Sequence, residues 1–229
     1  PAYISHPEGP GSHPGVVVAM HIFGIDRFVR GKCDELAEAG FMAIAPYLFH
    51  RTDVSHEDLG GFDYADGSRW ERVPTLKATL NDDEIVEDML AAASYLRSLD
   101  TVGQRLGVTG FCIGGRIAYL MAVRTDAFSA CADFYGGEIE QSWGDGVPPL
   151  DQTNQLSCAL AGYFGNDDYN PTPADVDRLE EELRKHNKPY EFHRYEGANH
   201  AFNDPFNPDR WREHAGMDSG EKVAEFFTR

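Results

Sequence analysis

Residues 107–122, Gly-Val-Thr-Gly-Phe-Cys-Ile-Gly-Gly-Arg-Ile-Ala-Tyr-Leu-Met-Ala, place a cysteine between two glycines where a strand is expected to give way to a helix. The residues before Cys112 are short, apolar and β-branched, and apolar residues recur at helical spacing after it. Gly110 and Gly114 stand two positions either side of the cysteine. A turn this tight strains its central residue and crowds the flanking positions against backbone, so only glycine fits there. We therefore expect a strand–turn–helix that exposes the Cys112 thiol at a helix N-terminus, where the helix dipole lowers a thiol pKa.

Short apolar segments alternate with amphipathic segments on both sides of this turn. The pattern predicts further strands at 15–20, 41–46, 129–135, 157–164 and 190–196, and helices at 26–39, from 81 onward, at 172–187 and at 217–227. Such alternation is typical of an α/β protein with a mostly parallel sheet and helices on both faces. We expect one domain over residues 1–229. Two long insertions, 47–80 and 137–156, are expected to shape a pocket, and the first has room for a short helix.

Composition excludes several classes of partner. The net charge of −18 leaves no basic stripe to neutralise phosphates, so neither nucleic acid nor an anionic membrane is expected as a partner. The longest aliphatic run, at 16–20, is far too short to span a bilayer, and the first residues lack the pattern of a leader peptide. We therefore expect a soluble cytoplasmic protein. The four cysteines are expected to be reduced thiols, and no His/Cys spacing resembles a metal site.

Acid and base candidates follow the later predicted strands. Parallel sheets bind ligands at the carboxyl ends of their strands, so we looked there for partners of Cys112. One such segment contains Asp167 and Asp168, and a later one contains His200. His200 would take the thiol proton and later protonate the leaving group, while an aspartate would orient the imidazole. The residues alone leave the two aspartates equivalent. Each candidate also has a structural alternative: a core cysteine, a solvated Asp turn and a surface histidine.

The assembled motifs resemble the dienelactone hydrolase (carboxymethylenebutenolidase) family of the α/β-hydrolase superfamily. The matching pieces are Ile-Phe-Gly-Ile at 22–25, Ala-Pro-Tyr-Leu-Phe at 45–49, Gly-Phe-Cys-Ile-Gly-Gly at 110–115, Phe-Tyr-Gly at 134–136, Gly-Asn-Asp at 165–167 and Ala-Asn-His-Ala-Phe at 198–202. The turn around Cys112 corresponds to the nucleophile elbow of these enzymes, with cysteine where most carry serine. The resemblance implies a triad of Cys112, Asp167 and His200, which selects the first aspartate. It also implies an oxyanion hole made by the backbone N–H groups of Ile22 and Ile113.

Two departures from the family pattern bear on the substrate. The family usually has a glutamate that helps to activate the thiol, where this chain has His21. It also has an arginine four residues beyond the catalytic histidine, where this chain has Asp204. We expect His21 and Tyr135 to contact the substrate or activate the thiol. The chain offers three candidates for a second carboxylate-binding arginine: Arg51, Arg69 and Arg72.

The expected activity is hydrolysis of a small-molecule ester or lactone through an acyl-cysteine intermediate, without a cofactor or a metal ion. A general carboxylesterase or a thioesterase could use the same triad. A non-catalytic protein of this fold that binds a small molecule is the alternative outside enzymes. The oligomeric state is expected to be a monomer or a small homo-oligomer.

Overall fold

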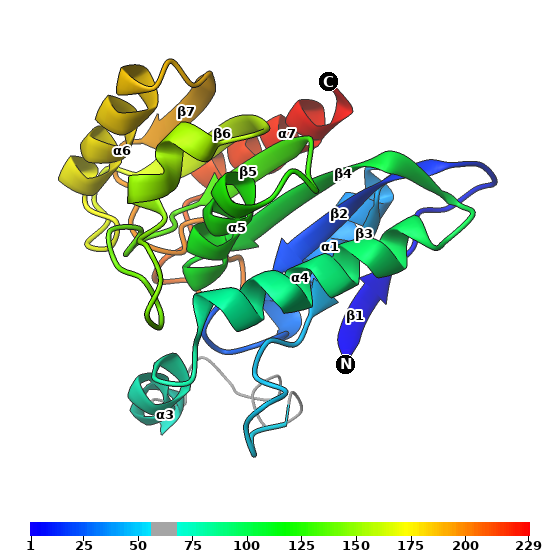
Figure 1. Cartoon of the computed structure of the whole chain (residues 1–229), viewed down its shortest axis with the longest axis horizontal. Helices are drawn as coiled ribbons and strands as arrows, with labels where there is room; N and C mark the ends of the chain where they lie inside the picture. Colours follow the sequence, from blue (N-terminus) through cyan, green and yellow to red (C-terminus); the bar gives the residue numbers. More distant parts are fainter. Residues whose placement is uncertain (56–67) are drawn as a thin grey trace.

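A computed structural model describes residues 1–55 and 68–229, together with the side chains of all of these except Ser68 and Arg69. One twisted sheet runs through the molecule (Figure 1). Its strands are β1 (Ala2–Ser5), β2 (His13–Ala19), β3 (Met42–Pro46), β4 (Val102–Phe111), β5 (Ala130–Phe134), β6 (Ala159–Gly165) and β7 (Tyr190–Tyr195). Their order across the sheet is β1-β3-β2-β4-β5-β6-β7, and all neighbours are parallel except the antiparallel β1–β3 pair. The predicted mostly parallel α/β architecture is confirmed.

Helices cover both faces of this sheet (Figure 1). The helical elements are α1 (Arg27–Glu38), α3 (Ser68–Lys77), α4 (Asp82–Arg97), α5 (Ile113–Arg124), the 3₁₀ helix η1 (Leu150–Gln155), α6 (Pro173–Lys185) and α7 (Glu213–Thr228). Helices α4 and α5 pack together on one face, and α1 and α7 lie on the other. Because both faces are covered, the central strands are apolar throughout: the last five residues of β2 and the last six of β4 are buried.

The main elements match the sequence prediction to within a few residues at each end. The short helix foreseen within 47–80 is α3, and η1 lies in the second insertion. Strand β1 was not predicted. Its four residues carry no clear alternation and are only partly buried, and the strand is defined by its pairing with β3, a contact distant in sequence.

A buried ion pair fixes the start of α5 against α4. Arg116 donates from Nη1 and Nη2 to the two carboxylate oxygens of Asp82, at 2.7 and 3.1 Å, and its side chain is completely buried. The guanidinium also lies over the ring of Trp143, 3.7 Å from its centre. A bidentate pair of this kind sets orientation as well as distance. Through Arg116, one turn after Cys112, helix α5 is thus held against both α4 and the 137–156 insertion.

Every helix in the described part of the chain is too short or too polar to cross a lipid bilayer.

Candidate active site

Cys112 occupies a strained turn between β4 and α5. Its backbone has φ 60° and ψ −122°, the left-handed side of conformational space that non-glycine residues rarely adopt. The flanking glycines are required by close packing. A Cβ on Gly110 would lie 2.1 Å from the carbonyl oxygen of Gly114, and one on Gly114 would lie 2.4 Å from that of Ala19. The predicted elbow is therefore confirmed, with the thiol at the first turn of α5.

His200 and Asp168 lie together at the same edge of the sheet. Nδ1 of His200 lies 3.0 Å from Oδ2 of Asp168, whose side chain is fully buried, and Oδ1 of Asp168 accepts the backbone N–H of Asn170 at 2.8 Å. The ring of Tyr135 meets His200 edge-on at 5.0 Å. The phenol oxygen of Tyr135 donates to Oδ1 of Asn203 at 2.6 Å. These contacts fix the imidazole with its other nitrogen free to face the thiol.

This arrangement corrects the choice of Asp167, whose side chain is exposed. Hydrogen bonds continue the β6–β7 pairing past the strand ends, because the N–H of Asp167 donates to the carbonyl of Ala198 at 2.9 Å. The chain then turns back, and the N–H of Asp168 donates to the carbonyl of Gly165 at 3.3 Å. The turn therefore exposes the side chain of Asp167 to solvent and directs the side chain of Asp168 inward, toward the imidazole of His200. The resemblance to the family had selected the neighbouring residue.

Charges around the thiol favour its ionised form. Burial alone would raise the pKa of Cys112, but the charge of His200 and its hydrogen bond to the sulfur outweigh burial and lower that pKa. His21 and the N–H of Ile113 lower it further by smaller amounts. Conversely, burial would lower the pKa of His200, and the thiolate and Asp168 raise it above its ordinary value. The two groups therefore favour a thiolate–imidazolium pair, the form in which a cysteine acts as a nucleophile.

The thiol opens into a pocket of about 180 Å³. Its walls are largely apolar and contain several aromatic side chains. They include Ile22, Ile113, His21 and Tyr135, so the structure brings the predicted pocket residues together around Cys112. The polar members of the lining also include the ion pair of Lys77 with Glu138, together with Asp204, Asn207 and Arg210.

His21 lies in the turn that follows β2 and is 7% exposed. Its Nε2 lies 2.8 Å from Oδ1 of Asp26, and its Nδ1 accepts the backbone N–H of Phe23 at 3.3 Å. Burial lowers the pKa of His21, but Asp26, and to a smaller extent Cys112 and Asp204, raise it above the ordinary value. His21 therefore lies close enough to the thiol for their charges to interact, and its role toward the substrate stays a prediction.

Of the three arginines named from the sequence, the two whose side chains are described do not line the pocket. Arg51 pairs with Asp88 through Nη1 at 2.5 Å and does not line the pocket, Arg72 is exposed outside it, and the side chain of Arg69 is outside the described residues. The arginine that does line it, among the described residues, is Arg210, whose Nη1 donates to the carbonyl of His200 at 3.3 Å. Sequence reasoning missed it because it comes ten residues after the histidine in a loop without a recognisable motif.

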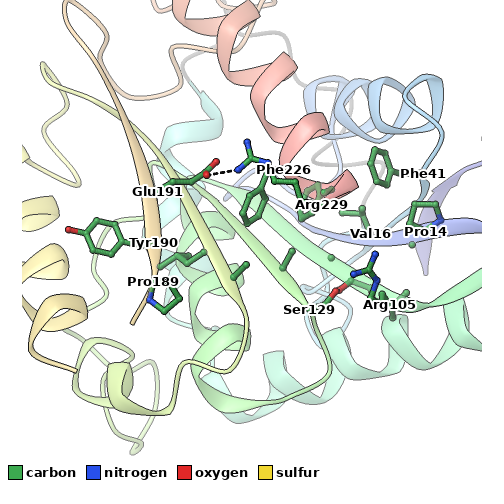
Figure 2. A pocket seen from close by; sticks show the side chains of 17 residues that line it. Pro14, Val16, Phe41, Arg105, Ser129, Pro189, Tyr190, Glu191, Phe226 and Arg229 are labelled. Carbon is green, nitrogen blue, oxygen red and sulfur yellow. Dashed lines mark hydrogen bonds and ion pairs between the residues drawn. The ribbon is translucent and has the colours of Figure 1, made fainter. Parts of the chain in front are cut away.

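A second hollow, of about 490 Å³, opens near the starts of β2, β5, β6 and β7 and the C-terminal end of α7 (Figure 2). The described residues that line it include neither cysteine nor histidine, and its carboxylate, Glu191, pairs with Arg229 at 2.7 Å. Although it is the larger cavity, it lacks a nucleophile–base pair. The smaller pocket, by contrast, contains both Cys112 and His200. Among the described residues no group of three His, Cys, Asp or Glu side chains could hold a metal ion.

Comparison with known proteins gives the class. A model of the dienelactone hydrolase family matches residues 1–229. A Synechocystis protein named "Putative carboxymethylenebutenolidase" is 31% identical over 98% of this chain and 89% of its own length. A Bradyrhizobium protein named "Probable 2-oxo-3-(5-oxofuran-2-ylidene)propanoate lactonase" is 32% identical over 90% of this chain and 79% of its own. The crystal structure titled "Putative Dienelactone Hydrolase" from Klebsiella pneumoniae superposes with a TM-score of 0.86 at 29% identity, covering 100% of this chain and 92% of the other.

The chain belongs to the dienelactone hydrolase family and has the α/β-hydrolase fold. It is a hydrolase that acts on a small molecule, and the interpretation as a non-catalytic binding protein is set aside.

Proposed function

We propose that this enzyme hydrolyses a small ester or lactone through an acyl intermediate on Cys112. The observation that carries the proposal is the continuous contact from thiol to imidazole to buried carboxylate. The side chain of His200 is hydrogen-bonded to Cys112, and its Nδ1 lies 3.0 Å from Asp168. Nucleophile, base and orienting acid in this order are the minimal set for acyl transfer.

In the acylation step the thiolate attacks the carbonyl carbon, a C–S bond forms, and the carbonyl electron pair moves to oxygen. Collapse of this tetrahedral species breaks the C–O bond. The departing oxygen takes the proton from Nε2 of His200, because Nδ1 faces Asp168. With an ester the alcohol leaves. With a lactone the ring opens and the new hydroxyl stays attached to the acyl chain.

In the deacylation step His200 accepts a proton from water, which attacks the thioester carbonyl. The second tetrahedral species expels the thiolate, and the carboxylic acid product is released. Asp168 supports both steps because its carboxylate stabilises the imidazolium without itself gaining a proton.

The oxyanion in both steps would be bound by the backbone N–H groups of Ile22 and Ile113. Both residues line the pocket beside Cys112, and Ile113 is the first residue of α5. Its N–H lies in the first turn of that helix, where backbone N–H groups have no acceptor within the helix and the dipole favours negative charge. It already hydrogen-bonds the sulfur, which is consistent with a donor aimed at the reacting atoms.

The test is trapping of the intermediate. With an activated p-nitrophenyl ester, the wild-type enzyme should release one equivalent of nitrophenol in a burst, and intact-mass analysis should find one acyl group on Cys112. Cys112→Ala should give neither, and Cys112→Ser should lose most of the rate because a hydroxyl is the weaker nucleophile. Cys158→Ala is the matched control, because burial raises the pKa of that thiol to about 12 and it does not line the pocket. Full turnover by Cys112→Ala would rule out the covalent mechanism.

A further inference from the structure

The side chain of His21 folds back onto its own backbone. The turn of residues 21–24 is closed by the N–H of Gly24, which donates to the carbonyl of His21 at 2.9 Å. Inside this turn Nδ1 of His21 accepts the N–H of Phe23, two residues on, at 3.3 Å. Asn and Asp side chains make the same bond to the residue two positions ahead when they stabilise turns. The imidazole therefore takes the role of a turn-forming side chain around Ile22.

The other ring nitrogen ties this turn to helix α1. Nε2 lies 2.8 Å from Oδ1 of Asp26. The same oxygen accepts the N–H groups of Phe28 at 3.0 Å and Val29 at 3.1 Å, so it also caps the helix. The ring of His21 packs edge-on against Phe23 at 5.6 Å and Phe28 at 5.9 Å. Turn, histidine and helix start are thus joined as one buried unit.

We propose that His21, held by Asp26, is a positioning residue that fixes the 21–24 turn so that the N–H of Ile22 is directed at the substrate oxyanion. The inference rests on the proposed function and adds a residue outside the triad to it. Nδ1 of His21 accepts the N–H of Phe23 and Nε2 lies 2.8 Å from Oδ1 of Asp26, so both ring nitrogens face groups other than Cys112. The effect of His21 is on the geometry of the oxyanion hole.

A role through charge is the competing explanation, because His21 is in electrostatic contact with Asp26, Cys112 and Asp204. His200 has the larger influence on the sulfur and is hydrogen-bonded to it. The ionisation of Cys112 should therefore survive the loss of His21. A positioning role and a charge role then differ in what a substitution changes: the first changes kcat, the second also changes the pH at which the thiol reacts.

The test compares His21→Asn with His21→Gln. The amide oxygen of asparagine can accept the N–H of Phe23 as Nδ1 does, whereas glutamine reaches toward Asp26 and lacks an acceptor at that position. Loss of one oxyanion donor lowers kcat by about 100- to 1000-fold, which sets the upper limit for a donor that is misdirected rather than removed. We expect His21→Gln to lower kcat about 10- to 100-fold with KM nearly unchanged, and His21→Asn to recover at least tenfold of that loss.

Two further measurements make the outcome decisive. The pH dependence of Cys112 alkylation by iodoacetamide should move only slightly in both variants, because His200 has the larger influence on the sulfur. Asp26→Asn retains the capping oxygen but removes the charge. Its kcat should therefore be close to that of His21→Asn. His13→Gln, at the other end of β2, is the matched control and should leave kcat unchanged, because His13 is outside the pocket and contacts the carbonyl of Gly40 at 3.2 Å.

The proposal is overturned if His21→Gln has the kcat of the wild type. It is equally overturned if Asn and Gln lose activity alike while the alkylation curve moves to higher pH, since that pattern belongs to a charge role. Both results concern the His21 variants only. A failure of the proposed covalent mechanism is distinguishable from them, because it would appear as turnover by Cys112→Ala.

Discussion

Two adjacent aspartates allow the acid of the triad to be tested with a matched pair of substitutions. Asp168→Asn keeps the size of the side chain and can keep Oδ1 as acceptor for the N–H of Asn170, which lies at 2.8 Å. It removes the charge that faces Nδ1 of His200 at 3.0 Å. Asp167→Asn makes the same chemical change one residue earlier, on an exposed side chain, while the backbone N–H of that residue donates to the carbonyl of Ala198.

The expected magnitude follows from the contact that is lost. A hydrogen bond to a charged group contributes roughly 1.5–3 kcal/mol, and each 1.36 kcal/mol is a factor of ten in rate. Asp168→Asn should therefore lower kcat/KM about 10- to 150-fold. A serine hydrolase loses about 10⁴-fold from the same change. The loss should be smaller here because the pKa of Cys112 is already lowered by its surroundings, so less depends on proton removal by His200 in the first step.

The assay is steady-state hydrolysis of an activated ester across pH, with thermal unfolding as the check on folding. Because Asp168 helps to raise the pKa of His200, its removal should move the alkaline limb of kcat to lower pH, where the imidazolium that protonates the leaving group is lost earlier. Asp167→Asn should stay within twofold of the wild type at every pH. The reasoning would be refuted by wild-type activity in Asp168→Asn together with a large loss in Asp167→Asn.

Two further predictions concern groups around the triad. Asp133 is buried behind the elbow, its Oδ2 has no hydrogen-bond partner among the described residues, and burial raises its pKa from 3.8 to about 7. A raised pKa means that the folded state holds the proton more tightly, so the free energy of unfolding should fall as pH rises from about 4 to about 7, by on the order of 4 kcal/mol at most. Asp133→Asn should abolish this decline in urea titrations; an unchanged decline would contradict the assignment. For substrate charge, Asp204 lines the pocket while the charge of Glu138 is paired with Lys77, so Asp204 should give a neutral ester or lactone a higher kcat/KM than its carboxylate-bearing counterpart. Arg210→Gln should widen that difference by about tenfold, the value of one charge-assisted contact; the opposite preference in the wild-type enzyme would show that Arg210 dominates recognition of the substrate.

The elements around the elbow could be predicted because their signals are local. Glycine is required at 110 and 114 because a Cβ at either position would lie less than 2.5 Å from a backbone oxygen in this tight strand–helix turn. The strands are apolar throughout because both faces of the sheet are covered. The position of His200 after β7 follows from the same logic, since parallel strands deliver their carboxyl ends to one edge. These features need no knowledge of distant contacts.

The features that sequence reasoning missed depend on contacts that are distant in the chain. Asp168 rather than Asp167 faces the imidazole because backbone bonds from the 165–168 turn run to residues around Ala198. A shift of one residue in that pairing would exchange the two side chains, and both are aspartate, so composition carries no information on the choice. Strand β1 and the pocket position of Arg210 are likewise fixed by β3 and by the loop after His200, which the local pattern does not record.

Bond breaking and substrate choice rest on different parts of this chain. The geometry of the proposed triad depends mainly on backbone: the positive φ of Cys112, the turn that presents Asp168, and the strand ends from which both follow. The charge that a substrate meets depends instead on side chains such as Asp204 and Arg210, which lie in one loop after β7. A loop side chain can change without disturbing the sheet, whereas a changed turn would move the nucleophile or the base. We therefore expect the departure at Asp204 to change which substrate binds, while the positions of Cys112 and His200 stay as the backbone sets them.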